Sequence, residues 1–132
     1  MSILVSAFYA GLCGLLAVLL ANHVLYVRLR SASQPKWRPD AVLRVQANFV
    51  ENVPLALLLL LMMELNGTSH LILHVFGLSL IACRLLHAFG LSRNEGANYP
   101  RLIGAQGTFL LLSIMAVSLI YAFIMSSGAV RP

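Results

Sequence analysis

The stretch RVQANFVENVPLALLLLLMMEL, residues 44–65, joins a polar beginning to a long apolar run. The second half suits the hydrocarbon interior of a bilayer. The first half places an arginine, a glutamine, two asparagines and a glutamate where the bilayer should begin. A helix needs about 20 residues to cross a bilayer, and residues 41–65 supply that length. The stretch therefore predicts a membrane-spanning helix with a polar face near one end.

The composition of the whole chain agrees with a membrane protein. Of its 132 residues, 60% are hydrophobic and 10% are charged, and the mean hydropathy is +0.88. Backbone amides must be satisfied within the chain in hydrocarbon, which favours helices for spans this apolar. We expect an all-α integral membrane four-helix bundle, a single domain over residues 1–132 with helices at about residues 3–28, 41–65, 70–91 and 100–127.

The charges between these spans predict the orientation in the membrane. The first loop region carries Arg28, Arg30, Lys36 and Arg38, and the third carries Arg93 and Arg101, whereas residues 66–70 have no formal charge. The positive-inside rule places the first and third loops in the cytoplasm and both termini on the opposite side. The first apolar run exceeds a signal-peptide core and follows no basic residue, so we expect a retained helix.

The net charge of +5 raises the question of a partner. The basic residues flank apolar spans and do not form a continuous soluble surface, which favours anionic membrane lipids or an acidic small molecule over nucleic acid. We expect no transit peptide or retention tail, which fits a bacterial inner membrane and leaves the endoplasmic reticulum as the alternative.

The polar residues of the second helix form a stripe. Arg44, Asn48 and Glu51 follow one another at spacings of four and three residues, so they share one helix face. Glu51 lies deep enough to need a partner, and Arg84 in the third helix could neutralise it in a purely structural pair. The alternative is a water-filled pocket in which Arg44, Asn48 and Glu51 hold a zwitterionic ligand.

The third and fourth helices add polar groups at the same end. Arg84 and His87 lie three residues apart, and Arg101 follows a proline at the start of the fourth helix. Gly104 and Thr108 form a pair of small residues one turn apart, which predicts a close helix–helix approach near Arg101.

The other histidines and the cysteines have simpler interpretations. His23, His70 and His74 are expected to form hydrogen bonds between helices, and no metal site is expected from them. Cys13 and Cys83 fall within spans and are interpreted as packing thiols.

RVQANFVENVPL resembles the signature of the MAPEG family, the membrane-associated proteins in eicosanoid and glutathione metabolism. The glutathione-conjugating leukotriene synthase of that family has the same residues in the order and spacing of Arg44, Gln46, Asn48, Glu51 and Pro54. VRLR, residues 27–30, and RLLHAF, residues 84–89, resemble segments of its microsomal prostaglandin E synthase.

The resemblance implies a homotrimer that binds glutathione between adjacent subunits. The residues implied to contact glutathione are Arg28, Arg44, Gln46, Asn48, Glu51 and His87. Arg101 is implied to favour the glutathione thiolate, which attacks a lipophilic electrophile or reduces a hydroperoxide; Arg93 is the alternative to Arg101. The chain has Leu91 where the family enzymes usually carry a tyrosine one turn after the position of His87, and Asn52 where the leukotriene synthase carries another.

Two other functions fit the sequence less well. A member of the family can keep the fold without glutathione chemistry and bind another thiol or a lipid. A small proton-coupled exporter is less favoured, because residues 1–27 lack an acidic residue and Glu64 is expected to lie exposed at the outer end of the second helix.

Overall fold

The computed structural model describes residues 4–31, 39–93 and 98–128, and the regular structure in these ranges is entirely α-helical. The helices are α1 (Val5–Ser31), α2 (Pro39–Leu65), α3 (His70–Arg93) and α4 (Tyr99–Gly128). Each is long and apolar enough to cross a membrane. The prediction of four membrane-spanning helices is confirmed, although α1 continues three residues further than expected.

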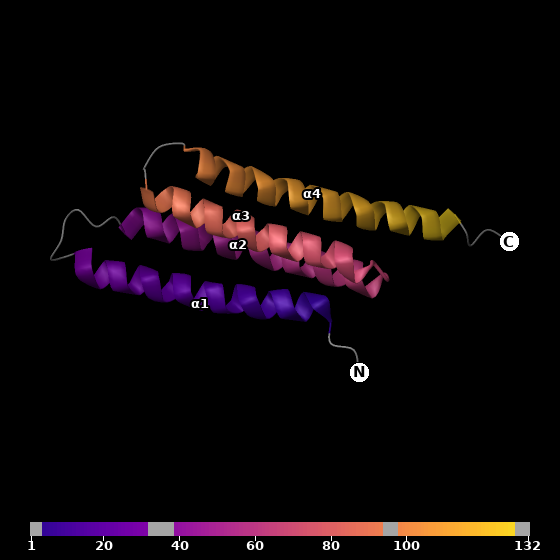
Figure 1. Cartoon of the computed structure of the whole chain (residues 1–132), viewed down its shortest axis with the longest axis horizontal. Coiled ribbons are helices and arrows are strands. Elements are labelled where there is room, and N and C mark those ends of the chain that lie inside the picture. The colour runs from indigo at the N-terminus through magenta and orange to yellow at the C-terminus, as the bar shows by residue number, and fades with distance from the viewer. Residues whose placement is uncertain (1–3, 32–38, 94–97, 129–132) are drawn as a thin grey trace.

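Successive helices run antiparallel in a bundle (Figure 1). Helix α3 contacts the three other helices, α2 does the same, and α1 and α4 lie on opposite sides of this central pair. The end of α1, the start of α2, the end of α3 and the start of α4 therefore lie at the same end of the bundle. This arrangement brings the polar parts of α2, α3 and α4 together.

The helix ends have local causes. Arg28 and Arg30 lie in the last turn of α1, where positive side chains interact favourably with the helix dipole. Helix α2 begins at Pro39, whose missing N–H is not needed in the first turn, and Asp40 follows at the positive end of the dipole. These charges let both helices extend beyond their apolar segments.

The apolar core lies between α1, α2 and α3 and includes one residue of α4. The tyrosine ring of Tyr9 is 1% exposed and lies against Gly77, where an added Cβ would clash with the ring. Its hydroxyl hydrogen-bonds Nδ1 of His74 at 2.9 Å, which confirms the interhelical role expected for that histidine. Cys13 is buried, Cys83 is half-buried, and both are free thiols.

Glu64 differs from its sequence-based prediction. Its side chain is half-buried, and its two carboxylate oxygens accept hydrogen bonds from the backbone N–H groups of Val5 at 2.6 Å and Ser6 at 2.8 Å. The expectation of an exposed carboxylate was wrong because the start of α1 lies against the end of α2. Glu64 caps α1 and satisfies donors that have no partner within the helix.

Candidate functional site

A polar pocket of about 270 Å³ lies at the end of the bundle where α2 and α4 begin and α3 ends. Its lining brings together five of the seven residues predicted for the site. The lining residues are Arg44, Ala47, Asn48, Glu51, His87 and Arg101. Residues far apart in the sequence thus share one small space, which includes two guanidinium groups and one carboxylate.

Helix α2 supplies four of the six lining residues, and three of these form the predicted stripe. Arg44 and Glu51 are exposed at the pocket, and Asn48 between them is half-buried. Val45 and Phe49, each one residue after a member of the stripe, are buried in the bundle. The apolar face fixes the rotation of α2, and this rotation directs the polar stripe into the pocket.

Asn98 positions Arg101 at the start of α4. Its side-chain Oδ1 accepts a hydrogen bond from the backbone N–H of Arg101 at 3.0 Å, which is the geometry of a helix N-cap. The Nδ2 group of Asn98 donates to the backbone carbonyl of Gly90 near the end of α3. One side chain thus joins the two helices and holds the turn that carries Arg101.

Arg84 lies behind the pocket and is only 4% exposed. One terminal nitrogen donates to Oδ1 of Asn48; the other donates to the carbonyl of Gly104 at 3.0 Å and to Oγ1 of Thr108 at 2.5 Å. The suggested pair with Glu51 is not formed in the described part of the chain. Arg84 contacts α4 and Asn48 instead, and its buried Nε has no hydrogen-bond partner among the described residues.

The close approach expected at Gly104 and Thr108 is present. Both residues are buried, and a Cβ added at Gly104 would clash with the carbonyl of Cys83 and with the backbone of His87. Glycine therefore lets α4 approach α3 closely enough for the Gly104 carbonyl to accept from Arg84.

The other two predicted site residues, Arg28 and Gln46, do not line the pocket of this single chain. Arg28 is exposed in the last turn of α1, and Gln46 is half-buried on another face of α2. The side chains of Leu91 and Arg93 lie outside the part of the chain that the structure describes. Of the two arginines considered for thiol activation, Arg101 is the one whose side chain is described, and it lines the pocket.

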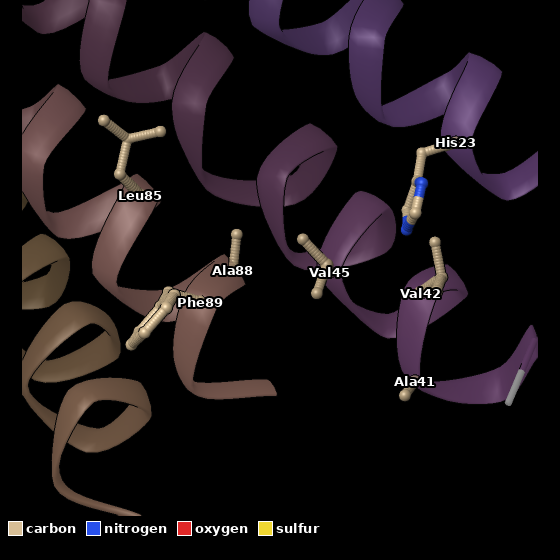
Figure 2. Close-up of a pocket in the computed structure, with 7 residues that line it drawn as sticks. All are labelled: His23, Ala41, Val42, Val45, Leu85, Ala88 and Phe89. Carbon is tan, nitrogen blue, oxygen red and sulfur yellow. The ribbon is translucent and has the colours of Figure 1, made fainter. Parts of the chain in front are cut away.

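A second cavity, of about 320 Å³, lies on the other side of α2 and α3 (Figure 2). It is lined by His23, Ala41, Val42, Val45, Leu85, Ala88 and Phe89. Figure 2 shows that these residues come from α1, α2 and α3. This cavity is larger than the polar pocket, but His23 is the one polar side chain among the described residues that line it. It therefore has fewer groups that could bind a charged ligand.

The polar pocket has the groups needed for a zwitterionic or anionic ligand. Arginine presents planar donors that match a carboxylate, and a glutamate accepts hydrogen bonds from an ammonium group. The supporting roles of Asn98 and Arg84 were not predicted from the sequence. An asparagine directly before a Tyr-Pro helix start is a recognisable N-cap signal, whereas the contacts of Arg84 depend on the packing of α3 against α4.

The chain is 36% identical over 93 residues to the inner membrane protein YecN of Escherichia coli K12, covering 66% of this chain and 70% of that protein. YecN of Escherichia coli O6:H1 matches to the same extent. No solved structure matches with significance. The model of the MAPEG family matches residues 6–121, which include α2, α3, most of α1 and α4 and every residue that lines the polar pocket, and the chain belongs to the MAPEG family.

Proposed function

We propose that this chain is a glutathione-dependent transferase or peroxidase of the bacterial inner membrane that acts on a lipophilic electrophile or hydroperoxide. The observation that carries the proposal is the convergence of Arg44, Glu51 and Arg101 on one pocket at the end of the bundle. Membership of the MAPEG family and similarity to an inner membrane protein support it.

The pocket's charges match those of glutathione. Glutathione has two carboxylates, one ammonium group and a thiol. Arg44 and Arg101 suit the carboxylates and the thiolate, and Glu51 suits the ammonium group. His87 is buried at the pocket wall and adds a ring nitrogen as a further hydrogen-bonding group.

The chemistry is activation of the glutathione thiol. A guanidinium beside the sulfur stabilises the thiolate relative to the thiol, and we assign this role to Arg101. In the transferase reaction the thiolate forms a carbon–sulfur bond with the electrophile. The electron pair of the bond broken at that carbon leaves with the departing group or, in an addition or ring opening, takes up a proton from solvent. In the peroxidase reaction two glutathione molecules become a disulfide, while the hydroperoxide becomes an alcohol and water. Neither reaction needs a covalent bond to the protein.

A homotrimer would complete the site. The cavity in one chain, about 270 Å³, lies just below the range of about 300–1,000 Å³ that is usual for ligand pockets. Arg28 and Gln46 lie outside it. In the proposed assembly a neighbouring subunit supplies these two side chains, and glutathione binds between the subunits.

The test is isothermal calorimetry of glutathione binding to the purified protein in detergent, with the ultraviolet absorbance of the thiolate followed in parallel. Glu51→Gln should weaken binding about tenfold or more, since a hydrogen bond to a charged group is worth about 1.5–3 kcal/mol. Asp40→Asn is the matched control: Asp40 is an exposed carboxylate at the same end of α2 that does not line the pocket, so binding should not change.

Each outcome has a distinct meaning. Binding with a thiolate signal at neutral pH supports the proposed enzyme and leads to a screen of electrophiles. Binding without a thiolate signal contradicts the activation step and points to a glutathione-binding protein without this chemistry. Absence of binding at millimolar glutathione overturns the proposal and favours another thiol or a lipid as the ligand.

A further inference from the structure

Asn48 lines the polar pocket and also touches the buried guanidinium of Arg84. An arginine can only donate hydrogen bonds, so the amide atom that faces Arg84 must be the oxygen. The NH₂ group of Asn48 is then the half of the amide left for the pocket. The orientation of this amide is therefore fixed by a residue that does not line the pocket.

The position of Arg84 is itself firmly set. Its guanidinium is held from α4 by the Gly104 carbonyl at 3.0 Å and by the Thr108 hydroxyl at 2.5 Å. Thr108 in turn donates its hydroxyl proton to the Gly104 carbonyl at 2.8 Å, which leaves its oxygen lone pairs for Arg84. These contacts fix the guanidinium plane and allow it to orient Asn48.

The electrostatics of Arg84 add to this orientation. Its side chain is 4% exposed, and no carboxylate pairs with it among the described residues. The pocket thus has three guanidinium groups in or directly behind its wall and one carboxylate, Glu51. A ligand with an excess of negative charge balances this set.

We propose that Arg84 is a positioning residue that holds the Asn48 amide with its NH₂ group toward the pocket, so that the site selects a ligand that presents a hydrogen-bond acceptor, such as a carboxylate oxygen, to Asn48. The inference deepens the proposed function, because it assumes that the ligand is glutathione or a similar acidic thiol. In this proposal Asn48 distinguishes a ligand oxygen that accepts a hydrogen bond, such as that of a carboxylate, from a hydrogen-bond donor. Arg84 sets the orientation of the Asn48 amide.

A double-mutant cycle on the glutathione dissociation constant tests the coupling. Arg84→Gln should weaken binding about tenfold when Asn48 is present and less than about twofold when Asn48 is already alanine. Equal losses in both backgrounds would overturn the proposal, because Arg84 would then act on the ligand or on the fold without Asn48. A purely structural role would lower the thermal midpoint without this dependence on Asn48.

A second variant serves if Arg84→Gln fails to fold. Asn48→Asp keeps an oxygen toward Arg84 but replaces the pocket-facing NH₂ group with a negatively charged oxygen. We expect at least a tenfold loss of glutathione affinity, together with an unchanged or raised thermal midpoint, because the buried guanidinium gains a carboxylate partner. Asn66→Asp is the charge control for affinity alone: Asn66 is exposed in the turn after α2, at the other end of the bundle, so glutathione affinity should not change. It is no reference for stability, because its Nδ2 group donates to the carbonyl of Met62 at 2.9 Å and Asp cannot replace that bond.

The thermal midpoint needs no ligand and separates the two proposals. If the wild-type chain binds no glutathione, the proposed function fails, and the midpoint of Asn48→Asp still decides the contact with Arg84. A midpoint below that of the wild-type chain would overturn the positioning role. Retained glutathione affinity in Asn48→Asp would overturn the selection of a carboxylate, even if Arg84 and Asn48 are in contact.

Discussion

Removing the carboxylate of Glu64 should destabilise the bundle from the start of α1. In Glu64→Ala the backbone N–H groups of Val5 and Ser6 lose acceptors that lie 2.6 and 2.8 Å away. Loss of a helix cap costs about 0.5–2 kcal/mol, and loss of a negative charge at the positive end of a helix dipole costs a further 0.3–1 kcal/mol or so. The free energy of unfolding should therefore fall by about 1–3 kcal/mol.

Thermal denaturation in detergent, followed by circular dichroism, measures this effect. A loss of about 2 kcal/mol corresponds to a midpoint lower by about 6–10 °C for a chain of this size. Glu64→Gln keeps one neutral acceptor oxygen and should show a smaller loss than Glu64→Ala. Glu51→Ala is the control, since this exposed carboxylate on the same helix has no bond to the start of α1. Equal midpoints for Glu64→Ala and Glu51→Ala would refute the capping argument.

Two further predictions concern the polar end of the bundle. Arg101→Ala should leave glutathione affinity within about threefold while raising the pKa of the bound thiol by about one unit or more. In a pH titration of the complex, the thiolate absorbance should therefore develop at higher pH. An unchanged titration curve would show that Arg101 does not activate the thiol. Gly104→Val should cost about 3 kcal/mol or more, because its side chain meets the backbone of α3, whereas Gly14→Val adds a side chain where no atom lies within 4 Å. Size-exclusion chromatography in detergent distinguishes them, and a well-folded Gly104→Val protein would contradict the close approach of α3 and α4.

The four-helix fold could be predicted from the sequence because each span is long and apolar and polar turns separate the spans. The end of α2 and the start of α3, at residues 65 and 70, were placed correctly. The largest error, three residues at the end of α1, arose where charged residues such as Arg30 continue the helix past its apolar part. Hydropathy measures the part of a helix within the hydrocarbon, whereas the dipole and the caps determine where the helix stops.

The polar pocket was partly predictable for a similar reason. The spacing of Arg44, Asn48 and Glu51 indicates one face of one helix, and the parity of the spans places His87 and Arg101 at the same end. Contacts between distant helices leave no such pattern. Glu64 and Val5 are 59 residues apart, and nothing in the periodicity of either helix indicates that they meet.

The hydrogen-bond partners of Arg84 could not be predicted from the sequence. A buried guanidinium suggests a carboxylate as its partner, and Glu51 is the acid available at the right depth. The structure instead satisfies Arg84 with the carbonyl of Gly104, the hydroxyl of Thr108 and the amide of Asn48. These neutral acceptors leave the positive charge of Arg84 uncompensated behind the pocket and leave Glu51 exposed at the pocket itself.

This arrangement ties the packing of two helices to the charge of the pocket. The absence of a side chain at Gly104 lets α4 approach α3, and this approach brings the Gly104 carbonyl to the guanidinium of Arg84. A larger residue at Gly104 would therefore separate the helices and also withdraw an acceptor from a buried cation. Since Arg84 also holds Asn48, the displacement would reach the pocket wall. Substitutions at Gly104 or Thr108 should thus alter ligand binding through Asn48, although neither residue lines the pocket.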